Sequence, residues 1–441
     1  MGRKRRQQRL TIVHPNCAGI DLGSTAHYVA VDPSRSDEPV RRFGTFTDEL
    51  QALARWLHAC GVKTVAMEAT GVYWVPAFEL LEREGFEVVL VNPRAAKQIG
   101  GRKSDVLDCQ WLWQLMSYGL LKGAFRPADR ICELRSFVRQ RATLTRDAAR
   151  AVQHMQKALT QMNVQIDQVL SDITGKTGML ILRAIVAGER DPQVLARYRD
   201  GRVKADEATI ARSLQGNWRR EHLFALAQAI GRYDFYQQQI LACDAQILDT
   251  IGGLEQDIEL PDVPVLGRSP AEREMAVALR RMMGVDLTAI PTIGVETALV
   301  LAAEIGPDLS RFPTCEHFCS WLSVAPGTRI TGGKPLSGGS ARVLNVAGQA
   351  LRQAASTARH SKSFIGAAHR ARLARMDTAK AVKATAHHLA RLIYAMLTKG
   401  HEYVEQGIEQ FESEARERRL KNLQRQAHRL GLELVALETA A

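Results

Sequence analysis

The chain has 441 residues, enough for two or three domains, and its 46% hydrophobic and 24% charged content is that of an ordinary globular protein. No uncharged apolar run approaches the ~18 residues that a transmembrane helix needs, and the basic start MGRKRRQQRL is not followed by an apolar signal core. These features argue against a membrane or secreted protein, and we expect a cytoplasmic protein.

The charge balance points to an anionic partner. The formal net charge is +12 and the pI is about 9.5, and nucleic acid is the commonest partner of such a basic protein. The excess is concentrated, because residues 329–399 hold 13 Lys or Arg and a single acid, Asp377. We therefore predict a phosphate-binding face in this segment, the alternative being a basic protein without such a partner.

The cysteines indicate neither a disulfide framework nor a zinc site. There are seven, an odd number at scattered positions. Cys315, His317 and Cys319 lie close together in the chain, but no second ligand pair follows at zinc spacing. Two buried helical thiols are the better interpretation.

The N-terminal part alternates strands and helices. Residues 16–22 and 26–32 read as two strands joined by a tight Gly-Ser turn. Further strands are predicted at 62–68 and 86–92, and helices at 48–60, 75–84 and about 105–118. This order implies an α/β domain with a partly parallel sheet, ending near residues 126–127.

The pattern becomes helical from residue 131 onward. Apolar residues recur at helical spacing as far as residue 166, which predicts a long amphipathic helix and suits a coiled coil. Residues 170–285 continue mostly helical, with predicted linkers at 188–193 and 259–270. The outer face of the long helix is either solvated or a nucleic-acid contact, and it carries Arg135, Arg139, Arg141, Arg146 and Arg150.

A third region begins near residue 284. The stretch LTAIPTIGVETALVLAAEIG (287–306) predicts a helix, a Pro–Gly turn and an Ala-rich helix. Such a turn can point backbone N–H groups at a DNA phosphate, as in helix-hairpin-helix motifs. A Gly/Ser/Lys loop at 325–342 and helices at about 343–398 follow, and the tail 401–436 is charged and helical.

Four acids form a candidate metal site. Asp21 ends the first strand, Glu68 ends the strand 62–68, and Asp105 and Asp108 share one face at the start of a helix. If the two strands are neighbours, Asp21 and Glu68 lie side by side at their carboxyl ends, and the helix can bring its acids over them. The alternative for Asp105 is a helix cap, formed by it or by Ser104.

Four carboxylates need cations in order to lie together. Two unit charges 4 Å apart repel by roughly 4 kcal/mol at an effective dielectric constant of about 20. Oxygen ligands suit Mg²⁺ or Mn²⁺. Two such ions can bind the attacking and the leaving oxygen of a phosphodiester in the reaction. The stretch around Asp21 could instead be the phosphate loop of an actin-like kinase. That class needs a second Asp-Gly loop and an adenosine loop, for which we find no convincing position.

Two sequence blocks resemble a known family. The first contains GIDLGSTAHYVAV (19–31), MEATGVYW (67–74) and VNPRAAKQIGGRKSDVLDCQWL (91–112). The second contains IPTIGVETALVLAAEIGPDLSRF (290–312) and WLSVAPGTRITGGKPLSGGSARVLNVAGQALRQAA (321–355). Both are similar to the DEDD transposases of bacterial insertion sequences, the one-ten family with its eleven-eleven subgroup, which is related to Piv-type DNA invertases.

The resemblance implies an α/β part followed by a mostly α part. It implies a RuvC-like, ribonuclease-H-type domain whose metal ligands are Asp21, Glu68, Asp105 and Asp108, then a coiled-coil arm and a helical transposase domain with a helix-hairpin-helix-like turn. The corresponding boundaries are a basic tail at 1–15, the RuvC-like domain at 16–128, the arm at 129–285, the transposase domain at 286–400 and a charged helix at 401–441.

The resemblance also implies a nucleophilic serine that forms a covalent phosphoserine with DNA. Many relatives have Ser-Gly after the proline of the loop, where this chain has Thr331-Gly332. We expect Ser337 to be the nucleophile, with Thr331 and then Ser340 as alternatives. Residues expected to contact nucleic acid are Arg329, Lys334 and Arg342 in the loop and Arg135 and Arg139 on the arm.

The predicted function is a DNA transposase or recombinase that uses Mg²⁺ or Mn²⁺. As in the family, an RNA from the element, a bridge or seek RNA, is expected to guide the protein to donor and target DNA. Joining two DNA partners calls for a dimer to a tetramer. The alternatives are a RuvC-type junction nuclease in which water attacks and a non-catalytic nucleic-acid-binding protein.

Overall fold

The computed structural model describes most of the chain, and its two parts are treated separately here. It describes residues 11–69, 71–91, 105–255, 269–327, 329–332, 334–336 and 345–400 and several residues of a helix at 417–429. Two compact units are present, Met1–Arg126 and Pro127–Ala441. Among the described residues, no helix combines the length and the apolar character needed to cross a membrane.

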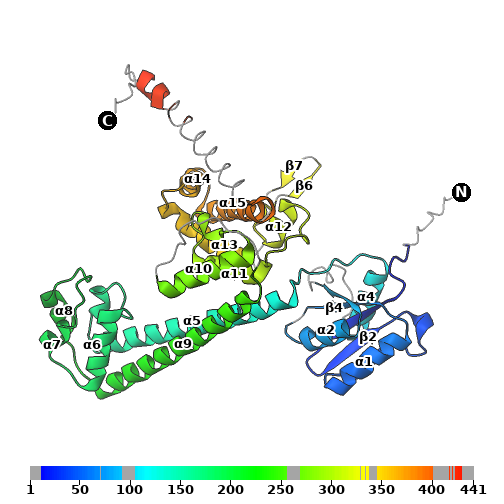
Figure 1. The fold of residues 1–441 in the computed structure, drawn as a ribbon, viewed down its shortest axis with the longest axis horizontal. Coiled ribbons are helices and arrows are strands. Elements are labelled where there is room, and N and C mark those ends of the chain that lie inside the picture. The colour runs from blue at the N-terminus through cyan, green and yellow to red at the C-terminus, as the bar shows by residue number, and fades with distance from the viewer. Residues whose placement is uncertain are drawn as a thin grey trace. The chain divides into compact units, whose positions relative to one another are not determined.

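The first unit is built on one mixed sheet with the strand order β3-β2-β1-β4-β5 (Figure 1). β1 pairs antiparallel with β2 and parallel with β4, and β5 extends the parallel part. The strands are β1 (Cys17–Leu22), β2 (Ala26–Ala30), β3 (Val40–Gly44), β4 (Thr64–Glu68) and β5 (Glu87–Val91). This confirms the predicted partly parallel sheet, and the arrangement is compatible with the expected ribonuclease-H-type domain.

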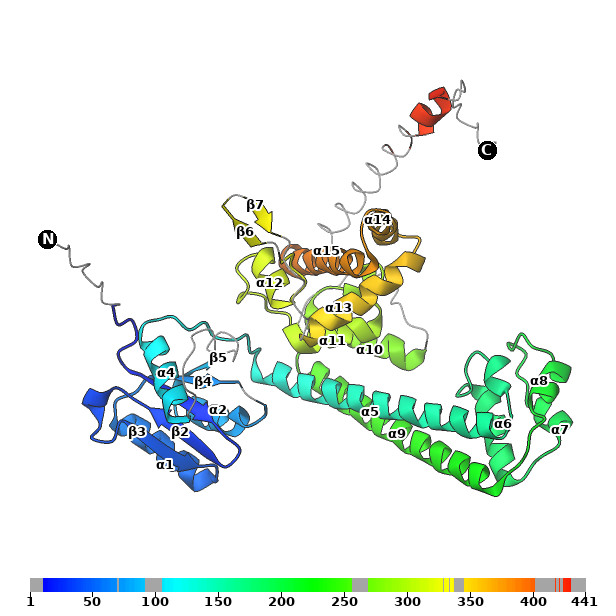
Figure 2. The ribbon, with the colours of Figure 1, turned by 180° about the vertical axis from the view of Figure 1, so that it is seen from behind.

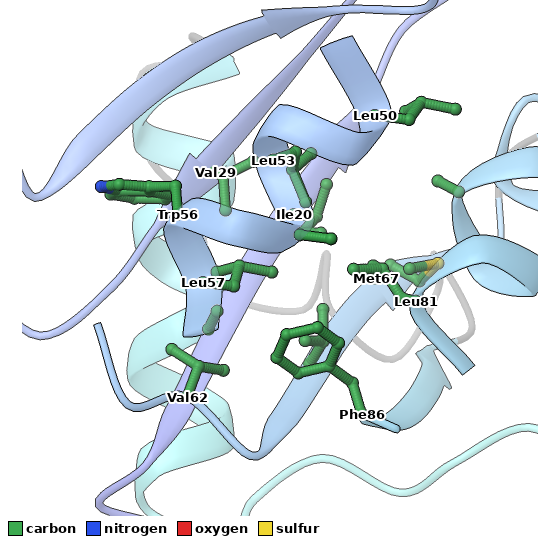
Figure 3. Packing of buried hydrophobic residues seen from close by; sticks show 14 of the residues in the cluster. Ile20, Val29, Leu50, Leu53, Trp56, Leu57, Val62, Met67, Leu81 and Phe86 are labelled. Carbon is green, nitrogen blue, oxygen red and sulfur yellow. The ribbon is translucent and has the colours of Figure 1, made fainter. Parts of the chain in front are cut away.

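Helices cover both faces of the sheet. They are α1 (Thr47–Ala59), α2 (Trp74–Arg83) and α4 (Asp105–Ser117), close to the predicted ranges, and a short 3-10 turn, η1 (Pro33–Arg35), was not predicted. On one face, strand residues such as Ile20 and Met67 pack against Leu53 and Leu57 of α1 and Leu81 of α2 (Figure 3). The other face is covered by α4, and the residues packed there are Cys17, Ala66, Val91, Leu112 and Met116.

The second unit begins with a long two-helix arm. α5 (Asp129–Gln161) and α9 (Arg220–Gly252) run alongside one another in Figures 1 and 2. At 33 residues each, they are about 50 Å long. The far end carries η2 (Ile166–Gln168), α6 (Lys176–Ala187), α7 (Pro192–Ala196) and α8 (Glu207–Ser213). The predicted long amphipathic helix is confirmed. The linker predicted at 188–193 joins α6 to α7 only over residues 188–191, because α7 begins at Pro192.

The rest of the second unit is a helical region with one hairpin. Its helices are α10 (Pro270–Met283), η3 (Leu287–Ala289), α11 (Val295–Ile305), α12 (Cys315–Trp321), α13 (Val346–Thr357), η4 (Ala358–His360), α14 (Phe364–Leu373) and α15 (Thr378–Lys399). The hairpin consists of β6 (Arg329–Thr331) and β7 (Lys334–Leu336). The helix predicted at the start of 287–306 is wrong in length. It is one 3-10 turn, because Ile290 precedes Pro291 and is extended, which ends the helix after Ala289.

Candidate active site

The sheet brings Asp21 and Glu68 to the same edge. β1 and β4 are parallel neighbours whose register pairs Ile20 with Met67, so the next residue of each strand, Asp21 and Glu68, lies at the same level. Cys17 and Ala66 face α4, and side chains alternate along a strand. Asp21 and Glu68 therefore lie on the α4 side of the sheet, and both are half-buried. The neighbouring strands that this site requires are confirmed.

Gly19 allows α4 to approach that edge closely. A Cβ atom at position 19 would lie 2.3 Å from the backbone nitrogen of Trp113 and 2.4 Å from the carbonyl oxygen of Cys109. Two residues earlier on β1, the thiol of Cys17 contacts the carbonyl oxygen of Trp113 at 3.7 Å. The strand thus meets successively earlier parts of α4 as it runs toward Asp21. The N-terminal turn of α4, where Asp105 and Asp108 stand, therefore comes to the Asp21 end of the sheet.

The electrostatics of Cys109 independently place two of the acids near one another. Cys109 is fully buried and donates from its thiol to the carbonyl oxygen of Val106 at 3.2 Å. Burial raises the pKa of this thiol to about 12, helped by the negative charges of Asp21 and then Asp108. Both carboxylates are thus close enough to act on the same sulfur atom. Asp108 is exposed, so it can also reach a ligand in solvent.

The donors at this edge suit a hard cation. They are carboxylate oxygens, the ligands that Mg²⁺ and Mn²⁺ prefer, and the buried thiol is already engaged. Among the side chains that the structure describes, no group of three or more His, Cys, Asp or Glu is assembled tightly enough to hold a metal. Only the backbone of Asp105 is described, so its side chain lies outside that comparison.

The candidate hydroxyl loop is partly described. Thr331 is exposed at the end of β6 and pairs with Lys334 across the turn, where Gly332 has a φ of +57°. The register also pairs Arg329 with Leu336, whose successor in the chain is Ser337. The two first candidates thus attach to opposite ends of the hairpin. Ser337, Ser340 and Arg342 lie outside the described residues, as do the side chains of Arg329 and Lys334.

The structure gives Arg135 and Arg139 an intramolecular partner. Arg139 grips Glu304 of α11 with two hydrogen bonds of 2.8 and 2.9 Å. Arg135 lies 3.3 Å from the same carboxylate and donates to the carbonyl oxygens of Ala303 and Glu304. Glu304 is 5% exposed, so this contact fastens α5 to α11. Any contact of these two arginines with nucleic acid would compete with it.

Arg141 forms a second attachment between the same helices. Its guanidinium donates to Glu296 of α11 at 2.8 Å and to Asp244 of α9 at 2.5 Å. Burial opposes its charge, but Glu296 and Asp244 together raise the pKa of Arg141 above its ordinary value. The prediction that the arginines lie on an outer face is wrong for Arg135 and Arg141, whose side chains are only 18% and 20% exposed. Their carboxylate partners come from distant helices.

Cys315 and Cys319 lie on α12 with their sulfur atoms 3.9 Å apart. Burial raises the pKa of both thiols, that of Cys319 to about 12. The Nδ1 atom of His317 lies 2.9 Å from the hydroxyl of Thr314, the N-cap residue of the same helix. These residues therefore contribute to the packing and the cap of α12.

Two family models match this chain. The first, a transposase model for the DEDD domain of IS110 elements, matches residues 18–164, which include β1, β4, α4 and α5. The second, described as the transposase IS116/IS110/IS902 family, matches residues 286–370. The chain belongs to the IS110 family of transposases. The resemblance inferred from the sequence is thereby confirmed, and this IS110-family protein is a DNA transposase, an enzyme that cuts and rejoins DNA. No curated protein matches the chain.

Sequence reasoning missed residues that organise this transposase. Gly19 permits the contact of α4 with β1, and its only signal is a glycine inside a strand pattern. Glu304 stands in an apolar, Ala-rich helix, which is an unusual place for an acid and does signal a buried partner. Arg372 is a third case and is described below.

Proposed function

We propose that this transposase cuts and rejoins donor and target DNA through a covalent serine–DNA intermediate. Mg²⁺ would be held by Asp21, Glu68, Asp105 and Asp108. The observation that supports this most is the convergence of Asp21, Glu68 and the N-terminal turn of α4 at one edge of the sheet. The two parallel strands and the helix that carry these acids meet at that edge, although the acids are up to 87 positions apart in the sequence.

The proposed chemistry needs one hydroxyl from the 331–340 loop. Its oxygen, in Ser337 by preference, attacks the phosphorus of a phosphodiester. A serine-oxygen–phosphorus bond forms, the bond to the leaving strand breaks, and that strand departs as a hydroxyl end that has gained a proton. Attack by the hydroxyl end of another strand then restores the serine and completes rejoining. When bound, Mg²⁺ would supply positive charge against the charge that develops on the phosphate.

Cationic residues around the loop would hold the DNA backbone. Arg329 and Lys334 belong to β6 and β7, and Arg342 follows in the chain. On the arm, Arg135 and Arg139 are the proposed contacts, provided that their ion pairs with Glu304 open. An element-encoded RNA is the proposed guide, and a dimer or tetramer would bring the DNA partners together.

The test is a covalent trapping assay on the full-length protein. Protein, Mg²⁺, element RNA and labelled donor DNA are incubated and separated on a denaturing gel. The variants are Asp21→Asn, Ser337→Ala, Thr331→Val and Ser340→Ala. Ser356→Ala serves as the matched control, because this exposed serine lies on α13 and outside the loop. Omission of the RNA tests the guide separately.

We expect a protein–DNA adduct that disappears in Asp21→Asn and in one loop-hydroxyl variant, and persists in Ser356→Ala. Loss of the adduct in Thr331→Val alone would identify Thr331, at the turn of the hairpin, as the nucleophile and leave the rest of the mechanism unchanged. Cleavage without any adduct, unaffected by the hydroxyl variants, would replace it with a RuvC-type nuclease that uses water. DNA binding without cleavage would leave a non-catalytic binding protein.

A further inference from the structure

Arg372 is a half-buried cation without a carboxylate partner in the described part of the chain. It stands near the end of α14 and donates to the hydroxyl of Thr385 on α15 at 3.0 Å. Its other nitrogen lies 3.4 Å from Nδ1 of His388, also on α15. Burial lowers the pKa of Arg372, which means that its charge is poorly solvated where it stands. Burying a guanidinium in this way is costly unless an anion compensates it.

The groups around Arg372 stay neutral. The buried Nδ1 of His369 lies 2.8 Å from the Thr385 hydroxyl. The same hydroxyl thus joins Arg372, from which it accepts, to His369, whose pKa is lowered by burial. Nδ1 of His388 likewise accepts from Arg372. Burial, followed by the charges of Arg372 and Arg391, lowers the pKa of His388 to about 4.

Two further cations, Lys383 and Arg391, line the adjoining face of α15 together with a histidine. Lys383, His387 and Arg391 follow one another at four-residue spacing, which places them on one side of the helix. Burial and then the charge of Arg352 on α13 lower the pKa of Lys383. Burial and then Arg391, Arg372 and Lys383 lower the pKa of His387, against a weaker opposite effect of Glu316. These cations therefore act on one another at close range.

Acids are scarce in the sequence of α13, α14 and α15. Residues 345–400 contain ten Lys or Arg and one acid, Asp377. Asp377 already caps α15 and holds the ammonium group of Lys380 at 2.8 Å. Glu316 on α12 is the acid that acts on His387 and Arg391 from a packed neighbour. Such a cluster destabilises the free protein and is relieved by an external anion.

We propose that α13, α14 and α15 form a binding site for backbone phosphates of nucleic acid, made by Lys383, Arg391 and Arg352 and anchored by Arg372. The proposal rests on the proposed function only in taking nucleic acid as the partner. It adds a site separate from the 331–340 loop. Arg372 is the positioning residue, because its hydrogen bonds fix α14 against α15 and set the cationic face. A guanidinium and an ammonium group are the side chains that bind phosphodiesters.

The test measures binding without chemistry. Full-length protein in EDTA is titrated into a labelled DNA duplex and, in a second arm, a labelled single-stranded RNA, each at several salt concentrations. The variant is Lys383→Gln/Arg391→Gln. The charge-matched control is Arg55→Gln/Arg83→Gln, two exposed arginines on α1 and α2. Lys383→Arg/Arg391→Lys keeps both charges.

For at least one of the two nucleic acids, we expect the slope of log K against log salt to fall by about 1.4–1.8, since each lost phosphate contact removes about 0.7–0.9. The control pair and the charge-keeping pair retain the wild-type slope. The arm that changes identifies DNA or RNA as the source of the phosphate.

A thermal melt without nucleic acid separates binding from folding. If the face is a binding site, Lys383→Gln/Arg391→Gln melts at or above the wild-type temperature, because repulsion has been removed. An unchanged slope in both arms, or a loss of binding with a lower melting temperature, would overturn the proposal. Because no adduct is scored here, this outcome is independent of the trapping assay.

Discussion

Gly19 of β1 and Cys109 of α4 touch through their backbones, with 2.4 Å between the carbonyl oxygen of Cys109 and the place where a Cβ of residue 19 would stand. Gly19→Ala must therefore push α4 away from the sheet. We expect a loss of about 1–3 kcal/mol in the free energy of unfolding, as for overpacked cores, and loss of DNA cleavage. Urea unfolding and a cleavage assay measure the two effects.

The control for this change is Gly201→Ala. Gly201 has no atom within 4 Å of its Cβ position and no positive φ, so alanine should be neutral there. If Gly19→Ala retained wild-type stability and cleavage, the close contact with α4 would not be what assembles the site.

Mg²⁺ should stabilise the protein through the carboxylates at the sheet edge. At a free concentration about five times the dissociation constant, binding to the folded state contributes about 1 kcal/mol. We expect the melting temperature to rise with Mg²⁺ in the wild type and to stay constant in Asp21→Asn and Glu68→Gln. Asp308→Asn, a change in an exposed turn, is the control. Equal shifts in all variants would place the metal elsewhere.

Glu304 should matter more to stability than Glu296, although both bind arginines of α5. Glu304 is 5% exposed and neutralises two guanidinium groups, one of them well buried, whereas the Glu296 side chain is 64% exposed. We expect Glu304→Gln to cost about 3 kcal/mol, because it removes the carboxylate charge beside the buried Arg135, and Glu296→Gln to cost about 1 kcal/mol or less. Denaturant unfolding of both variants provides the comparison. A larger loss for Glu296→Gln would contradict this ranking.

Thr292 should be replaceable by glycine with a gain in stability. Its φ of +77° is an outlier for a β-branched residue, and its buried hydroxyl oxygen has no hydrogen-bond partner among the described residues. Thr292→Gly removes both penalties at the cost of a more flexible unfolded chain, and we expect a net gain of about 1 kcal/mol. Thermal melting tests it, with Thr292→Ala as the control that removes the hydroxyl and the γ-methyl group but keeps a Cβ atom at the positive φ. A lower melting temperature for the glycine variant would show that the neighbouring contacts of Thr292 outweigh the strain.

The neutral His388 should make the protein less stable in acid. Its pKa of about 4 lies below the ordinary 6.5, so between these values the unfolded chain binds a proton that the folded protein does not. The free energy of unfolding therefore falls as the pH falls from 6.5 toward 4, by up to roughly 3 kcal/mol from this residue. His388→Gln should flatten the pH dependence between pH 7.5 and 5 in urea unfolding. His369 and His387 leave a remainder of the same sign. An unaltered pH dependence would mean that His388 is protonated in the folded protein.

The elements of the first unit could be predicted because their signals are local. Strands ending at Asp21 and Glu68 are short apolar runs, and α1 shows an apolar stripe at helical spacing. β3 was missed, since its sequence VRRFG carries two arginines on an edge strand and has no clear alternation. Its presence follows from pairing with β2, which only the folded chain reveals.

The site could be predicted only in its residue types. Carboxylates at strand ends are visible in a sequence. The pairing of β1 with β4 had to be assumed, and the only sign of the close contact at Gly19 was a glycine inside a strand pattern. The arginines of α5 show the opposite difficulty. Their partners Glu296 and Glu304 lie 155 or more positions away, so the helix looked like a solvated surface. The periodicity of a local sequence predicts which face of a helix is buried. It does not show which acids from distant helices will bind the arginines of that helix.

The attachments of Arg139 and Arg141 to α11 also have a mechanical meaning. From Arg141 to the end of α5 the helix continues for about 30 Å, at 1.5 Å per residue, and packs against α9. The pair of helices is thus held to α11 near one end, where the hydrogen bonds of Arg139 and Arg141 lie. A rotation of the arm by about 10° about this attachment would move its far end by about 5 Å, roughly the pitch of one helical turn. The positions of α6, α7 and α8 at the far end of the arm therefore depend on Glu296 and Glu304, although these two residues lie far from them.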